Sequence, residues 1–228
     1  MRHLLGRAGS AVLDLLLPLH CAGCAAPATA WCQRCASALG GLHRIHRPLV
    51  VDGPPMYALG AYRAAARRAV LAYKESGRRQ LAAPLARQLA VGLVGLAPRL
   101  RLGPGTLLVP APSRAVAARR RGGSHMTRLA RQLAAELPDW ELRVADCLRI
   151  AHRAADSAAL DPQQRLRNLA GNVRLRPGRL PARPVEAVLL DDVITTGATV
   201  ASCSRALRTT PVRVRAVLSL TATAGPRG

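Results

Sequence analysis

The segment that most restricts the fold is residues 187–199, with the sequence AVLLDDVITTGAT. An apolar run over residues 185–190, interrupted only by Glu186, predicts a strand buried on both faces, as in the middle of a parallel sheet. The run ends in Asp191 and Asp192, and two more apolar residues lead through a Thr- and Gly-containing turn into a helical segment, residues 199–208. This order predicts a loop at the carboxyl ends of the strands, where open α/β sheets bind ligands.

The loop after this strand has the chemistry of a sugar-phosphate site. Its backbone N–H groups and the positive end of the helix suit a phosphate dianion. The residues concerned are Thr195, Thr196, Gly197, Ala198 and Thr199. Gly197 allows a close approach or a positive φ. Asp191 and Asp192, the candidate catalytic residues, can accept hydrogen bonds from vicinal ribose hydroxyls and add negative charge near a diphosphate-bound Mg²⁺ ion. The alternative, a solvated strand end and an ordinary helix cap, explains only parts of the pattern.

The rest of the chain alternates helical and strand patterns, which predicts an α/β fold with a parallel sheet covered by helices. Helices are expected at residues 10–17, 62–73, 80–96, 126–137, 163–169 and 199–208. Strands are expected at residues 49–53, 107–110, 142–144, 185–190 and 212–220. A polar, His-rich connector over residues 40–48 predicts a boundary between an N-terminal part, residues 1–48, and a larger domain, residues 49–228.

Four of the six cysteines form two closely spaced pairs: Cys21, Cys24, Cys32 and Cys35. Two C-x2-C turns can build a tetrahedral all-sulfur site, which suits a structural Zn²⁺ ion because no position remains for water. Disulfides and an iron–sulfur cluster are the alternatives; a reducing compartment disfavours the first, and the paired spacing favours zinc over the second. We expect the isolated Cys147 and Cys203 in the core. We expect His20, His43 and His46, which lie near the four-cysteine segment, at the surface and not as metal ligands.

The formal charge of +22 leaves two interpretations open. A basic surface attracts the phosphates of nucleic acids. Alternatively, Lys74 is the only lysine among 34 basic residues, and such a strong preference for Arg is what a GC-rich genome produces. Aromatic residues make up only 2% of the chain, so it is poor in the stacking platforms that single-strand binders use.

The N-terminus superficially resembles a lipoprotein signal. Asp14 interrupts its apolar run, and His20 stands where a small residue should precede the cleavage point. No stretch is expected to reach the length of a transmembrane helix. The sequence therefore predicts a cytoplasmic protein without membrane insertion.

Residues 187–199 resemble the phosphoribosyl-diphosphate loop of type I phosphoribosyltransferases, and nearly the whole chain resembles the ComF family of competence-associated proteins. The shared features are the four cysteines preceded by residues 14–18 (DLLLP), Tyr73-Lys74 with Gly77, residues 109–112 (VPAP), Arg121-Gly122, and Arg165 with Asn168 and Gly171. The combination of cysteine pairs and phosphoribosyl loop is specific, whereas the other features are weak alone.

The resemblance implies a type I phosphoribosyltransferase-like twisted parallel sheet flanked by helices, with a small N-terminal zinc-binding subdomain. It also implies that phosphoribosyl diphosphate binds with Mg²⁺ at the loop described above. A second loop would then bind the diphosphate, with Ser113 and Arg114 donating hydrogen bonds to its oxygens. Lys74 would face the same diphosphate as a compact cation.

Two positions depart from the family pattern. Many relatives have Arg-Gly-Phe-Asn-Gln where this chain has Arg121-Gly122-Gly123-Ser124-His125, and a Gln where Ser157 falls. We expect His125 at the surface, because no partner carboxylate is evident from the spacing. The implied activity is transfer of phosphoribosyl to an unknown nitrogen acceptor. The alternative is a non-catalytic DNA-uptake accessory protein that binds single-stranded DNA through the basic residues 114–121 and contacts the DNA-uptake machinery.

Overall fold

The computed structural model describes residues 19–50, 52–113, 123–151 and 173–224. Its centre is a six-stranded sheet in the order β1-β2-β8-β7-β3-β4, in which only the β1–β2 pair is antiparallel. The strands are β1 (His43–Ile45), β2 (Met56–Ala61), β3 (Leu107–Pro110), β4 (Arg143–Val144), β7 (Val185–Ile194) and β8 (Val212–Ala222). The expected α/β fold with a mostly parallel sheet is therefore confirmed.

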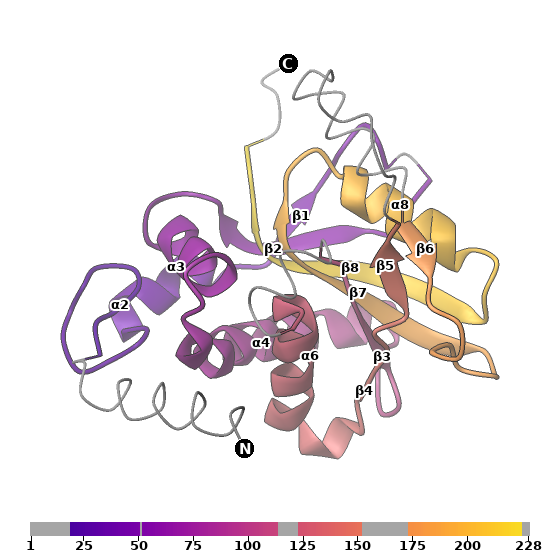
Figure 1. Cartoon of the computed structure of the whole chain (residues 1–228), viewed down its shortest axis with the longest axis horizontal. Helices are drawn as coiled ribbons and strands as arrows, with labels where there is room; N and C mark the ends of the chain where they lie inside the picture. The colour runs from indigo at the N-terminus through magenta and orange to yellow at the C-terminus, as the bar shows by residue number, and fades with distance from the viewer. Residues whose placement is uncertain (1–18, 51, 114–122, 152–172, 225–228) are drawn as a thin grey trace, which may run out of the picture.

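Helices cover both faces of this sheet (Figure 1). One face carries α3 (Ala64–Lys74), α4 (Ala82–Leu100) and α6 (His125–Glu136), and the other carries α8 (Ala198–Leu207). A two-stranded antiparallel hairpin of β5 (Leu148–Ile150) and β6 (Val173–Leu175) packs on the same face as α8. Shorter elements are α2 (Gln33–Ala36), η1 (Ser37–Leu39), η2 (Arg79–Leu81) and η3 (Pro138–Trp140).

Two clusters of buried apolar residues fill the space between the sheet and its covering layers. The larger cluster joins α3, α4 and α6 to the sheet and is built mainly from Leu and Ala, including Leu85, Leu89 and Leu93 of α4. The smaller cluster joins α8 and the hairpin to the opposite face, with Leu189 and Val217 among its members. Both isolated cysteines, Cys147 and Cys203, belong to this second cluster and are fully buried, as expected.

The four-cysteine segment packs against the larger cluster. Cys21, Trp31, Cys35 and Leu39 are all buried members of that cluster. The chain then forms β1, which pairs with β2 and so extends the sheet by one short edge strand within the connector. The domain boundary at residue 48 remains a prediction. The connector over residues 40–48 contributes the edge strand β1 to the sheet.

Most of the expected elements that fall on described residues are present. The predicted strand at residues 107–110 matches β3, and the helices predicted at 62–73, 80–96, 126–137 and 199–208 correspond to α3, α4, α6 and α8. The strand predicted at 49–53 is wrong: residues 48–49 form a turn, and the strand β2 begins after Pro54-Pro55 rather than before it. The helices predicted at 10–17 and 163–169 lie outside the described residues.

One helical segment is long and apolar enough to cross a membrane by length and composition, contrary to the sequence expectation. It spans Arg79–Leu100 and has a mean hydropathy of 1.4 over its most apolar window. Leu85, Leu89, Leu93 and Leu96 on this segment have no exposed area, because they pack in the larger core cluster. The apolar residues of this segment therefore serve to pack the helix against the central sheet.

Candidate functional site

The candidate site lies at the carboxyl ends of β3 and β7. These two strands are parallel neighbours in the sheet. The helix that follows β3, α6, is followed by the edge strand β4, whereas the helix that follows β7, α8, connects to β8 on the other side of β7. The two helices also cover opposite faces of the sheet. Such a point, where the direction of winding reverses, is where open α/β sheets leave a crevice for a ligand.

The loop from β7 to α8 has the geometry of an anion site. Gly197 caps the helix with a left-handed backbone, φ +83° and ψ 0°. Thr195, Thr196 and Thr199 are exposed around it, and the Thr196 hydroxyl accepts a hydrogen bond of 3.4 Å from the N–H of Ala198. The loop thus presents hydroxyl groups and the N-terminus of a ten-residue helix to the same open space.

The two aspartates lie within the strand rather than in the loop after it. The sequence pattern placed the end of this strand at residue 190, but β7 continues to Ile194. Successive side chains of a strand point to opposite faces, so Asp192 faces α3 and α6, while Asp191 faces the side of α8. Asp191 is 7% and Asp192 is 4% exposed.

Burial affects the two carboxyl groups differently. Burial and the charge of Asp192 raise the pKa of Asp191 well above its usual range. Burial also acts to raise the pKa of Asp192, but hydrogen bonding to His125 and the charge of Lys74 lower it overall. The pair therefore has one carboxyl group that resists ionisation and one that is firmly ionised.

Asp192 receives two donors on a single oxygen. Lys74 Nζ lies 2.8 Å and His125 Nε2 lies 3.0 Å from Asp192 Oδ2. Lys74 is the last residue of α3, and its side chain is 38% exposed, so its ammonium lies between Asp192 and solvent. This sole lysine thus lies at the predicted site.

His125 also contacts Ser113, on the loop that follows β3. Ser113 Oγ lies 3.1 Å from His125 Nδ1. The expectation that His125 is a surface residue is wrong: it is 4% exposed, and its partner carboxylate is Asp192, 67 residues away in the chain. Spacing along the sequence gave no sign of this partner, because the two residues meet where α6 packs on β7.

Arg47 is a second residue that the sequence pattern did not single out. Its guanidinium is buried and donates hydrogen bonds to the carbonyl oxygens of Thr195, Ile194 and Thr223, at the ends of β7 and β8. Its Cβ also limits the space next to Gly197. Arg47 therefore ties the connector after the cysteine segment to the base of the candidate phosphate loop.

The other expected site residues divide into two groups. Among the described residues, the fold brings Lys74 to Asp192 and, through His125, also Ser113, while Asp191 faces the side of α8. The Thr195–Thr199 loop lies at the end of the same strand. The second group lies outside the described residues: Arg114, Arg119, Arg120, Arg121, Ser157, Arg165 and Asn168.

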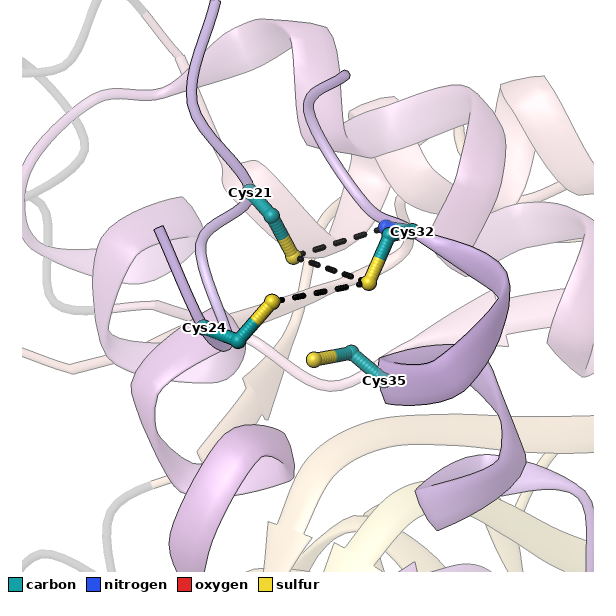
Figure 2. A group of neighbouring side chains, drawn as sticks. All are labelled: Cys21, Cys24, Cys32 and Cys35. Carbon is teal, nitrogen blue, oxygen red and sulfur yellow. Dashed lines mark hydrogen bonds between the residues drawn. The ribbon is translucent and has the colours of Figure 1, made fainter. Parts of the chain in front are cut away.

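The four cysteines of the N-terminal segment form a second candidate site (Figure 2). Their sulfur atoms all lie within 4.8 Å of one another, and Cys32 Sγ is 3.6 Å from both Cys21 Sγ and Cys24 Sγ. A tetrahedral ion with metal–sulfur bonds of about 2.3 Å places its sulfurs about 3.8 Å apart. The separations exceed a disulfide bond, and all four thiols are free. The cluster can therefore hold a metal ion.

The backbone around the cluster favours a thiolate at Cys21. Burial acts to raise the pKa of the Cys21 thiol, but N–H donors including those of Cys32 and Gly23 lower it to about 6. Gly23 leaves room for this arrangement, because a Cβ there would lie 2.6 Å from Cys35 Sγ. From α3, Arg68 donates a 2.6 Å hydrogen bond to the Gly23 carbonyl, so the first cysteine turn is held against the helix that ends in Lys74.

Sequence comparison adds no relative: no family model and no curated protein matches this chain. Solved structures that match this one include a hypoxanthine phosphoribosyltransferase from Staphylococcus aureus, at 15% identity and a TM-score of 0.35 over 65% of each chain. An adenine phosphoribosyltransferase matches at 14% identity and a TM-score of 0.37, over 82% of this chain and 89% of that one. Adenine phosphoribosyltransferase from Saccharomyces cerevisiae, complexed with an imino-altritol bisphosphate and adenine, matches at 13% identity and a TM-score of 0.38, over 83% of this chain and 90% of that one. Scores this low say nothing about what this chain binds.

Proposed function

We propose that this chain binds phosphoribosyl diphosphate at the carboxyl ends of β3 and β7. The observation that carries the proposal is the loop from β7 to α8, where three exposed threonines surround the left-handed Gly197 at a helix N-terminus. A buried parallel strand followed by this loop provides backbone N–H groups and hydroxyls for a dianionic phosphate. Within this proposal, Thr195 to Thr199 hold the 5-phosphate of the ligand.

The remaining groups of the ligand meet residues that the fold has already brought near this loop. Ser113, with Arg114 next to it in the chain, serves the diphosphate, and the aspartate pair serves the ribose hydroxyls. Asp192 is covered by Lys74 in this structure. A ribose hydroxyl reaches Asp192 when the ammonium of Lys74 turns toward the diphosphate, an exchange that leaves both the carboxylate and the cation with a partner.

Transfer of the phosphoribosyl group is the reaction that such a site suits. Mg²⁺ bound to the diphosphate would neutralise the negative charge of this leaving group. The chain's own residues would hold the anomeric carbon and a nitrogen acceptor in line, which lowers the barrier by positioning. A hollow of about 730 Å³ at the ends of β2 and β8, lined in part by Tyr62 and Arg63, offers a space for an acceptor.

For the four-cysteine site we propose structural zinc. Sulfurs that are 3.6 Å apart fit one tetrahedral ion, whereas the irons of a cluster bind separate thiolates and spread them further apart. Together with the phosphoribosyl loop, this site supports a relationship with the ComF family.

Single-stranded DNA is the weaker candidate ligand. Trp31, Tyr57 and Tyr73 are buried, so these three aromatic residues offer no platform on which bases stack. The basic residues 114–121 on which this alternative depends lie outside the described part of the chain. The described contacts therefore favour a small phosphorylated ligand.

The test is titration calorimetry with phosphoribosyl diphosphate and Mg²⁺. A variant carrying both Asp191→Asn and Asp192→Asn should bind at least about 10-fold more weakly, because the charged hydrogen bond from Asp192 contributes roughly 1.5–3 kcal/mol. The matched control is Asp139→Asn, an exposed aspartate in η3, which should bind like the wild type. Equal binding by the double variant and the wild type would refute the site. An assay of diphosphate release with a panel of nucleobases and amines tests transfer in the same samples.

A further inference from the structure

Arg47 is a buried cation whose contacts are all with neutral groups. It is only 8% exposed, and its guanidinium donates hydrogen bonds to four carbonyl oxygens, those of His46, Ile194, Thr195 and Thr223. Arginine is not deprotonated in proteins, so the guanidinium keeps its charge. Among the residues that the structure describes, no carboxylate forms an ion pair with Arg47. This positive charge is therefore solvated by carbonyl dipoles but not neutralised by them.

The backbone of the connector holds Arg47 against the loop from β7 to α8. A Cβ placed on Gly197 would lie 2.9 Å from Arg47 Cβ and 3.3 Å from Arg47 Cγ, so the loop and this side chain are in close contact. The Arg47 carbonyl accepts a 3.0 Å hydrogen bond from the N–H of Val50, whose side chain also borders Gly197. A turn of the connector thus fixes the guanidinium next to the candidate phosphate loop.

Two of the carbonyl groups that Arg47 contacts belong to peptide units at the start of this loop. A peptide unit is planar and trans, so its C=O and its N–H point in opposite directions. Because Arg47 holds the carbonyls of Ile194 and Thr195, the N–H groups of Thr195 and Thr196 point away from it. Within the described part of the chain these two N–H groups donate to no acceptor, and both residues are exposed. They can therefore donate to an anion on the side of the loop opposite Arg47.

We propose that Arg47 is a positioning residue that makes this loop selective for a dianionic phosphate over a singly charged group. Its charge acts through the two peptide units, because a guanidinium that polarises a C=O makes the N–H of the same unit a stronger donor. The inference rests on the proposed function, which places the 5-phosphate of the ligand at Thr195 to Thr199. A phosphate bound there supplies the counter-charge for Arg47, and no covalent bond is formed or broken.

The charge of the ligand is the property that this arrangement distinguishes. A phosphate monoester has a second pKa of about 6 and carries two negative charges at pH 8, whereas a sulfate ester carries one. Both groups present three terminal oxygens, so hydrogen bonds alone distinguish them poorly. One extra unit charge at roughly 10 Å from Arg47 changes the affinity by about tenfold at the effective permittivity of a protein. If Arg47 only braced the loop, its loss would weaken both ligands equally.

Three variants separate the charge of Arg47 from its shape. Arg47→Gln removes the charge and keeps an amide donor for the loop carbonyls, whereas Arg47→Lys keeps the charge on a different side chain. Arg213→Gln is the matched control, because Arg213 is an exposed arginine of β8. Arg213 pairs with Glu186 near the start of β7, at the other end of that strand from the loop.

The measurement is an NMR titration at pH 8 with ribose 5-phosphate and with ribose 5-sulfate, since NMR follows weak binding. The ratio of the two affinities should fall about tenfold in Arg47→Gln. It should stay close to the wild-type ratio in Arg47→Lys and in Arg213→Gln. The amide signals of α4 in the same spectra show whether each variant is folded.

Four results would overturn the inference. A ratio that is unchanged in Arg47→Gln, or that falls equally in Arg47→Lys, would refute the role of the charge while leaving the proposed function intact. A wild type that binds neither ribose 5-phosphate nor phosphoribosyl diphosphate would refute both. The last result needs no variant that could misfold: in the wild type, the amide hydrogen of Thr196 should shift further downfield with the phosphate than with the sulfate, and equal shifts would refute the inference alone.

Discussion

Gly197→Ala tests whether the base of the phosphate loop is as closely packed as the structure shows. Gly197 has φ +83°, a backbone region that side chains with a Cβ rarely adopt. A Cβ at this position would lie 2.9 Å from Arg47 Cβ and 2.9 Å from Val50 Cγ2. The substitution therefore strains the backbone and also pushes against the segment that carries the buried Arg47.

The expected loss of stability has two parts. The left-handed backbone costs a residue other than glycine about 1–2 kcal/mol. Overpacking against Arg47 and Val50 costs about 1–3 kcal/mol more, because Arg47 is anchored by hydrogen bonds to three carbonyl groups. A total near 3 kcal/mol corresponds to a fall in melting temperature of roughly 6–12 °C for a chain of this size.

Thermal unfolding of the wild type and two variants measures the parts separately. Gly105→Ala is the matched control, because Gly105 has φ +80° but a Cβ there would meet no atom of the described residues within 4 Å beyond its chain neighbours. Only the backbone cost of about 1–2 kcal/mol therefore applies to this control. Gly197→Ala should unfold at a lower temperature than Gly105→Ala. If the two variants lose equal stability, the close approach of Arg47 to the loop is refuted.

Two further predictions concern the cysteine cluster and the acidic strand. Metal analysis of the purified protein should find a single zinc per chain, lost in Cys24→Ser and retained in the control Cys147→Ser, whose thiol is buried in the other core cluster; zinc retained by Cys24→Ser would contradict the four-sulfur site. Because burial raises the pKa of Asp191, the folded protein keeps this proton to a higher pH than the unfolded chain, so stability is lost as the pH rises through the folded-state pKa. Asp191→Asn avoids that loss, so its stability relative to wild type in urea unfolding should grow from pH 4 to pH 8, by about 1.4 kcal/mol per unit of raised pKa. A difference that does not change with pH would count against a buried, protonated Asp191.

The sequence predicts the elements whose hydrophobic pattern is set locally. The strands β3 and β7 are continuous apolar runs, and α4 and α6 carry leucines at helical spacing, so these elements could be predicted. β2 was missed because Pro54-Pro55 suggested the end of a strand rather than its start. Its own residues, including Ala58 and Gly60, are too small to give a strong strand pattern, and their burial depends on contacts with other segments, among them the pairing with β8.

The candidate site was predictable in part for the same reason. The loop from residue 195 to 199 is contiguous in sequence, so its chemistry can be recognised from the residues alone. His125 and Arg47 act through partners that are 67 and about 150 residues away, and sequence spacing does not reveal such contacts. The extension of β7 beyond residue 190 was hidden because charged residues are rarely buried within a central strand.

The position of β8 in the sheet has a consequence for synthesis of the chain. β8 lies between β2 and β7, so it joins a strand from residues 56–61 to one from residues 185–194. On the ribosome, no nascent chain that ends before Val212 can connect these two strands through their native neighbour. The four cysteines, by contrast, lie within 15 residues of the chain, so their turns can form early. A nascent chain would thus carry a complete cysteine cluster before β8 is synthesised, and in that interval its exposed strand edges would need protection from aggregation.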